Sequence, residues 1–298
     1  MSIHSSSLLA GIVLLVAACS AGGTETTTTA NGDAVTTTVG EAAAATSPPG
    51  SPETVSGMFD VGSGINLYME CQGSGTPTII YLHGSINEPG FSATESSSAI
   101  RSTLGGEYRF CSYERRNVGR SDDVEGYFTG VTAVENLHAL MEGAGIEPPY
   151  VLLGASLGGL LAHIYSASYP DDVVGMVSLD GMFPGDITLD PVIPEDKRYD
   201  PDEDRDSLEK LSHYAALHEA LEMNPPDVPF HYLLAMPSGW PTMGVAAYDD
   251  AILDVLAEYV ASFPQGSMTE VESPHYMEVA VPVVIAEHLT QVIEEAGL

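Results

Sequence analysis

The chain has 298 residues, of which 44% are apolar, and it carries 42 acidic side chains against 9 Lys and Arg, for a formal net charge of −33. The apolar fraction and the length fit a folded domain with a sizeable core. The negative charge disfavours a nucleic acid as partner, because such a surface repels a phosphate backbone.

The first 18 residues are predicted to be an export signal. Leu8 to Ala18 is an apolar run too short to span a bilayer, and it ends in Val16-Ala17-Ala18-Cys19. Small residues before a cysteine resemble the lipobox of bacterial lipoproteins, in which Cys19 would be the lipidated first residue of the mature chain. The segment before the apolar run lacks Lys and Arg, so a wrongly chosen start codon or an ordinary secretory signal is also open. We expect an exported protein, anchored by lipid on the outer face of a bacterial cell membrane or else secreted.

Residues 19–55 are rich in Thr, Ala, Gly, Ser and Pro and hold almost no large apolar side chains. Such a segment buries too little surface to offset the entropy of ordering. We predict a disordered tether here and a single folded domain over 56–298.

The folded part alternates short apolar runs with helical patterns, which is typical of a mostly parallel sheet with helices on both faces. We expect strands at 58–61, 65–71, 78–82, 108–113, 150–153, 173–179, 230–235 and 267–271, and helices at 92–104, 132–143, 157–169, 246–263 and from 282 onward. The glycines around Ser63 predict a hairpin between the first two strands.

An insert at 181–228 interrupts this alternation. It contains an amphipathic helix with apolar residues at Leu208, Leu211, Tyr214, Leu217 and Leu221. We predict that the insert is a lid over a pocket at the carboxyl ends of the strands. The alternative is a peripheral segment without a role in binding.

Two cysteines remain if Cys19 is lipidated. Cys71 and Cys111 lie in or near predicted strands, and in an exported protein such a pair predicts a disulfide. Two free, buried thiols are the alternative. No metal-ligand spacing of Cys or His occurs, so we predict no metal.

The motif Gly154-Ala155-Ser156-Leu157-Gly158 lies between a predicted strand and a predicted helix. A serine on such a tight turn needs small neighbours, and its hydroxyl stands near backbone N–H groups that can hold an oxyanion. Ser156 is therefore the candidate nucleophile. The alternative is a glycine-rich turn that contains a serine by chance.

The order of these motifs along the chain resembles that of the α/β-hydrolase fold superfamily. A strand is followed by His83-Gly84-Ser85, then come the serine motif, a strand ending at Asp180 and a late His275. The segments 111–122 and 273–276 resemble bacterial esterase-like members, although Glu114 stands where relatives usually have Asp. The resemblance covers residues 56–298 and implies that fold.

The resemblance also implies a catalytic triad. Ser156 would be the nucleophile and His275 its base, since this histidine follows the last strand in a turn. For the acid we choose Asp180, directly after a strand, with Asp249 or Asp250 as alternatives.

Backbone N–H groups would form the oxyanion hole, one from Leu157 and the other from Ser85 or Gly84. Arg115, Arg116 and Arg120 lie close together in the sequence, and we favour a salt-bridged loop brace over an anion site for them.

These features predict a carboxylesterase-like serine hydrolase that acts on a small ester through an acyl-enzyme and needs no cofactor. A non-catalytic binding lipoprotein on the same scaffold, a peptidase and a C–C hydrolase remain alternatives. The sequence leaves the oligomeric state open.

Overall fold

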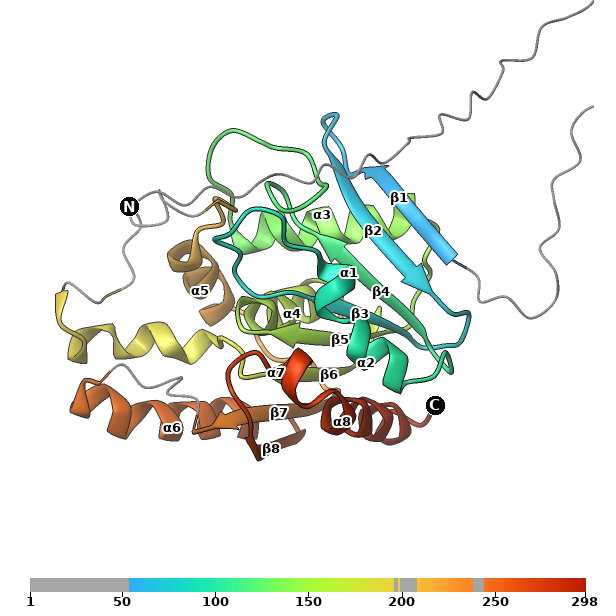
Figure 1. Cartoon of the computed structure of the whole chain (residues 1–298). Coiled ribbons are helices and arrows are strands. Elements are labelled where there is room, and N and C mark those ends of the chain that lie inside the picture. The colour runs from blue at the N-terminus through green and yellow to red at the C-terminus, as the bar shows by residue number, and fades with distance from the viewer. Residues whose placement is uncertain (1–53, 196–197, 199–207, 238–243) are drawn as a thin grey trace, which may run out of the picture. The chain divides into compact units, whose positions relative to one another are not determined.

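The computed structural model of the chain describes residues 54–195, 198, 208–237 and 244–298 (Figure 1). The predicted signal, Cys19 and nearly all of the predicted tether lie outside the described residues, while residues 54 and 55, assigned to the tether, belong to the first strand. Within the described ranges, no helix is both long enough and apolar enough to cross a bilayer.

The described residues contain one sheet in the order β1-β2-β4-β3-β5-β6-β7-β8. Its strands are β1 (Thr54–Asp60), β2 (Asn66–Gln72), β3 (Thr78–Leu82), β4 (Arg109–Glu114), β5 (Tyr150–Ala155), β6 (Val173–Leu179), β7 (Pro229–Met236) and β8 (Gln265–Glu272). Strands β3 to β8 run parallel, whereas β2 is antiparallel to both of its neighbours. The predicted, mostly parallel sheet is confirmed, and so is the β1–β2 hairpin.

Helices cover both faces of the sheet, as predicted (Figure 1). One face packs against α3 (Gly130–Gly143), α4 (Leu157–Ser168), α5 (His213–Leu221) and α6 (Ala246–Ala261), and the other against α1 (Ala93–Ser96), α2 (Ser98–Thr103), α7 (Met277–Ala280) and α8 (Pro282–Glu295). Side chains of a strand alternate between the two cores: Ile80 and Leu82 of β3 join the first, and Ile79 and Tyr81 the second. All four are fully buried, which explains the continuous apolar runs in the sequence.

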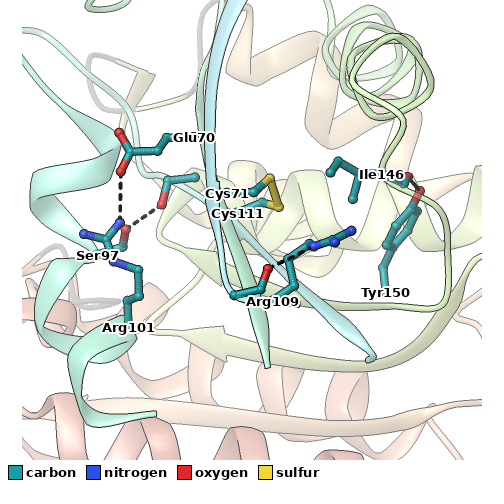
Figure 2. The surroundings of a disulfide bond; sticks show 10 residues. Glu70, Cys71, Ser97, Arg101, Arg109, Cys111, Ile146 and Tyr150 are labelled. Carbon is teal, nitrogen blue, oxygen red and sulfur yellow. Dashed lines mark hydrogen bonds and ion pairs between the residues drawn. A yellow bond between two sulfur atoms is a disulfide. The ribbon is translucent and has the colours of Figure 1, made fainter. Parts of the chain in front are cut away.

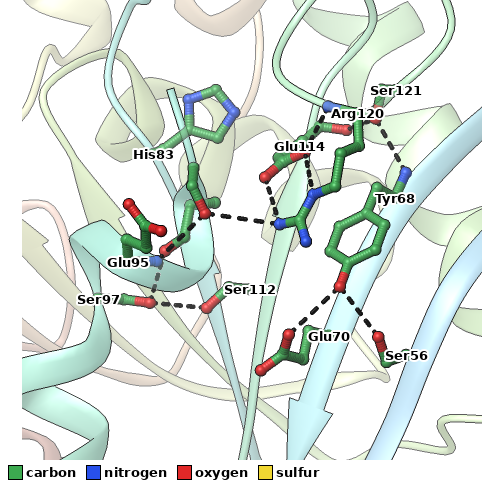
Figure 3. A network of polar contacts seen from close by, with 12 residues as sticks. Ser56, Tyr68, Glu70, His83, Glu95, Ser97, Ser112, Glu114, Arg120 and Ser121 are labelled. Carbon is green, nitrogen blue, oxygen red and sulfur yellow. Dashed lines mark hydrogen bonds and ion pairs between the residues drawn. The ribbon is translucent and has the colours of Figure 1, made fainter. Parts of the chain in front are cut away.

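The helix predicted over 92–104 is two short helices that meet at Ser97. The Ser97 hydroxyl is buried and donates to the carbonyl of Ala93, and its oxygen lies 2.7 Å from the Ser112 hydroxyl on β4 (Figure 3). A serine that bonds back to its own helix competes with regular helical geometry, and the sheet supplies the second partner. The prediction of one continuous helix was therefore wrong.

The insert forms the 3₁₀-helix η1 (Pro184–Val192) and the helix α5. Its amphipathic helix begins later than predicted, because Ser212 caps it by accepting a hydrogen bond from the N–H of Ala215 at 3.2 Å. Leu211 is instead buried in a β-bridge to Phe128, and Leu208 is 44% exposed.

Cys71 and Cys111 form a disulfide, as predicted (Figure 2). They are directly opposite one another on the antiparallel strands β2 and β4, with Cα atoms 4.0 Å apart. Both side chains are fully buried. Because β2 belongs to the antiparallel edge and β4 to the parallel part of the sheet, the disulfide links these two parts covalently.

Candidate active site

Ser156 occupies a sharp turn between β5 and α4. Its backbone has φ 51° and ψ −120°, a conformation that non-glycine residues rarely adopt. The turn is held by hydrogen bonds: the N–H of Ser156 donates to the Leu179 carbonyl at 3.1 Å, and the Ser156 carbonyl accepts from the N–H groups of Gly159 and Met182, both at 2.9 Å. A well-bonded but strained turn is the geometry that the sequence motif predicts.

Glycines around the turn leave no room for side chains. A Cβ atom on Gly158 would collide with the carbonyl oxygen of Leu82, and one on Gly154 would collide with the carbonyl of Gly158. A Cβ atom on Gly84 would lie 3.2 Å from the Cβ of Ser156. The strand ends and the helix therefore pack together only because these residues are glycine.

His275 and Asp180 lie against one another at the carboxyl edge of the sheet. His275 follows β8, Asp180 follows β6, and their Nδ1 and Oδ2 atoms are 2.7 Å apart. Asp180 is fully buried, and its other oxygen accepts from the N–H of Ala235 at 3.1 Å. Its φ of 44° turns the chain sharply after the strand, while its N–H donates to Leu233 at 2.8 Å. The carboxylate is thus held to orient the imidazole.

The alternative acids lie elsewhere. Asp249 is in the first turn of α6, where a carboxylate stabilises the helix dipole, and Asp250 is the next residue of the same helix. Neither lines the pocket that contains His275. Of the three candidate carboxylates, Asp180 is the one in hydrogen-bond contact with the imidazole.

Ser156 and His275 line the same cavity, which has a volume of about 650 Å³. Its other walls come from Tyr81, from residues 84–91 after β3, and from α1 and α7. Ser85, a predicted oxyanion donor, is part of this lining, and Leu157 is the first residue of α4, where a backbone N–H has no acceptor within the helix.

The insert contributes no described residue to the walls of this pocket. The structure therefore does not support the predicted lid within the described residues. The insert instead contacts the loop after β3: the Ser85 hydroxyl oxygen lies 2.7 Å from His213 Nε2, and the N–H of Ile86 donates to Glu209 at 3.4 Å.

Arg115 ties the insert to this loop. It donates to the carbonyls of His83 and Gly84, both at 2.7 Å, and pairs with Glu209 through both its Nε and its Nη2 atoms. The side chains of Arg115 and Glu209 are each only 1% exposed. Arg115 is therefore a brace beneath the loop, as favoured from the sequence, whereas no sequence pattern indicated Glu209 as its partner.

Arg120 also forms an ion pair, whereas the contact found for Arg116 in the described part of the chain is with an aromatic ring. Arg120 pairs with the buried Glu114 at 2.7 Å and lies over the ring of Tyr68, 3.3 Å from its centroid (Figure 3). Arg116 lies over the ring of Phe128, 5.5 Å from its centroid. Glu114, at the position where the resemblance leads one to expect Asp, is thus the ion-pair partner of Arg120.

His83 follows β3 but is unsuited to act as a base. Burial, and after it the neighbouring Arg115 charge, lower the pKa of His83 well below its usual value. The ring is 0% exposed and its Nδ1 atom lies 2.8 Å from the Gly84 carbonyl. Its place in the loop is therefore structural.

Comparisons with known proteins agree with this architecture. A family model described as alpha/beta hydrolase fold matches residues 77–206. The proline iminopeptidase PfmaB of Pestalotiopsis fici is 31% identical over 111 residues, which are 37% of this chain and 38% of that protein. The chain spans less than half the length of the curated relatives it matches.

Two solved structures illustrate the fold. The mouse alpha/beta hydrolase domain-containing protein 10 superposes with a TM-score of 0.59 at 16% identity, over 80% of this chain and 98% of that one. A thermophilic esterase from Thermogutta terrifontis superposes with a TM-score of 0.55 at 16% identity, over 82% and 99%. The sheet order, the turn at Ser156 and these similarities together show that this chain has the α/β-hydrolase fold.

Proposed function

We propose that the protein is a serine hydrolase that cleaves carboxylic esters of small molecules. The observation that supports this most directly is the 2.7 Å contact between His275 and the buried Asp180, in the wall of a cavity that Ser156 also lines. The cavity of about 650 Å³ is in the range that small ligands occupy.

The proposed reaction passes through an acyl-enzyme. With Nδ1 of His275 bonded to Asp180, Nε2 remains to take the proton of Ser156 as its oxygen attacks the carbonyl. The oxyanion accepts hydrogen bonds from the N–H groups of Leu157 and Ser85. His275 returns the proton to the leaving alcohol, and a water molecule then releases the acid by the same steps in reverse order. No metal or nucleotide takes part in this scheme.

A fluorophosphonate probe tests the nucleophile. The purified protein should be labelled on Ser156 and should hydrolyse short nitrophenyl esters, and Ser156→Ala should lose both properties. Ser102→Ala, on the exposed side of α2, is the matched control and should keep both. A folded wild-type protein that takes up no probe contradicts the proposal and favours the binding-protein alternative.

A peptidase is the second candidate, because PfmaB, to which the chain is 31% identical over 111 residues, is a proline iminopeptidase. The same triad cleaves amides on this fold. Parallel assays with nitrophenyl esters and aminoacyl anilides distinguish the two. An anilide cleaved with a higher kcat/KM than every ester would overturn the ester assignment while leaving Ser156 as nucleophile.

We further propose that the protein is exported and anchored through a lipid on Cys19, on the outer face of the bacterial membrane. The support is the apolar run that ends in small residues before Cys19. Labelling of cells with an alkyne-tagged fatty acid should mark the wild-type protein and not Cys19→Ala. Equal labelling of both proteins contradicts the anchor.

A further inference from the structure

Among the described residues, the lining of the candidate pocket includes two carboxylates and no Lys or Arg side chain. The carboxylates are those of Glu88 at the exposed rim and Glu278 in the wall. Three arginines of the segments that follow the pocket loop are already paired: Arg101 with Glu70, Arg115 with Glu209 and Arg120 with Glu114. A negative charge inside the pocket is therefore not balanced by the protein's own cations.

Glu278 is the more informative of the two carboxylates. It lies on α7, three residues after His275, and is only 8% exposed although it lines the cavity. Its Oε1 atom accepts a hydrogen bond from the Ser96 hydroxyl at 3.5 Å, and the Ser96 hydroxyl oxygen lies 3.2 Å from that of Tyr81. Strand β3 and helix α1 thus hold the carboxyl in the wall of the pocket.

The neighbours of Glu278 supply hydrogen bonds but no permanent positive charge. Burial raises the pKa of Glu278, and the His275 imidazole, which lines the same pocket, acts in the opposite direction. That imidazole must be neutral to act as a base, so it provides no counter-charge when the enzyme is ready to react. A desolvated carboxylate in this position gains most from a cation brought by a ligand.

We propose that Glu278 makes the pocket selective for substrates that carry a positive charge, such as an ammonium group, close to the reacting carbonyl. Glu88 at the rim and the charge of −33 on the chain favour the approach of the same ligands. This inference rests on the proposed hydrolase function and names its substrate class. The selected group can lie in the acyl part or in the alcohol part of the ester.

Two pairs of isosteric esters test the selectivity. The phenyl ester of trimethylammonioacetic acid is compared with phenyl 3,3-dimethylbutanoate for the acyl side, and acetylcholine with 3,3-dimethylbutyl acetate for the alcohol side. In each pair a quaternary nitrogen replaces a carbon of the same shape. The measured quantity is the ratio of kcat/KM between the cationic and the neutral ester, taken in the wild type and in Glu278→Gln, so that differences in intrinsic reactivity cancel.

We expect Glu278→Gln to lower this ratio at least about tenfold in one of the two pairs, which corresponds to about 1.4 kcal/mol of transition-state binding. Glu278→Met, which removes the charge with similar volume, should have the same effect. Glu95→Gln is the matched control: it removes a charge from α1 outside the pocket and should change the ratio less than twofold. A ratio that is unchanged by Glu278→Gln in both pairs overturns the inference.

Ligand binding to the Ser156→Ala variant, which needs no catalysis, tests the selectivity independently of the proposed hydrolase function. Calorimetric titration at low salt should show choline binding more tightly than 3,3-dimethylbutanol, or trimethylammonioacetate more tightly than 3,3-dimethylbutanoate, with the preference lost when Glu278→Gln is added. Absence of labelling and of ester hydrolysis refutes the hydrolase proposal alone. Equal binding within both pairs of ligands refutes the selectivity, whatever the catalytic result.

Discussion

The pair of Arg115 and Glu209 offers a sharp test of how the insert supports the site. Each side chain is 1% exposed, and the guanidinium also donates to the carbonyls of His83 and Gly84. Glu209→Gln keeps the shape but leaves the Arg115 charge buried without its counter-ion. Breaking a buried pair from one side costs about 3–5 kcal/mol, so we expect the free energy of unfolding to fall by about 3 kcal/mol.

The same change should reduce turnover. The loop that Arg115 holds carries Ser85, a proposed oxyanion donor, and a displaced donor typically lowers kcat by about 10²-fold. We expect Glu209→Gln to lower kcat by about 10- to 100-fold with a much smaller change in KM, measured at a temperature at which the variant is fully folded. Glu209 would then be a positioning residue, since it acts through the loop and lines no part of the pocket.

Urea denaturation and steady-state kinetics provide the two measurements. Glu70→Gln is the control, because Glu70 pairs with Arg101 at 3.5 Å in a partly exposed position, where a pair is worth about 1 kcal/mol or less. If Glu209→Gln and Glu70→Gln lose the same stability, the buried pair does not hold the loop in the way argued. A stable Glu209→Gln variant with wild-type kcat would contradict the positioning role.

Three further predictions follow from single contacts. Asp180→Asn should lower kcat by about 10⁴-fold, because an amide next to His275 favours the wrong tautomer, and stopped assays with a nitrophenyl ester measure this. Replacing Cys71 and Cys111 together by Ser should lower the free energy of unfolding by about 4 kcal/mol, since the disulfide closes a loop with a sequence separation of 40; an unchanged urea midpoint would contradict this. Burial lowers the pKa of His163 to about 4, so the stability that its neutral form provides is complete above pH 6.5 and is lost as the pH falls toward 4. This difference amounts to about 3 kcal/mol and should be missing in His163→Gln when unfolding is compared at pH 7 and pH 4.

Much of the fold is predictable because its signals are local. Apolar runs with the strand period, the glycines that flank Ser63 and the small residues around Ser156 depend on neighbours within a few positions. Predicted strands agree with the structure within a few residues, and the helix from Pro282 begins where expected. The break at Ser97 was missed because the second partner of its hydroxyl, Ser112, lies on β4, a segment separate from the helix.

The amino-acid sequence was enough to predict the strands of the sheet, the turn that presents Ser156 and the position of His275 after the last strand. These features depend on steric limits and hydrophobic periodicity, which act over short distances along the chain. The sequence favoured Asp180 as the partner of His275 but left Asp249 and Asp250 open, and the contact itself, between residues 95 positions apart, is seen in the tertiary structure alone. That structure alone paired Arg115 with Glu209, 94 positions apart, and put Glu278 in the pocket wall. Contacts of this kind arise where strand ends converge at one edge of a sheet, and no local pattern encodes which side chains meet there.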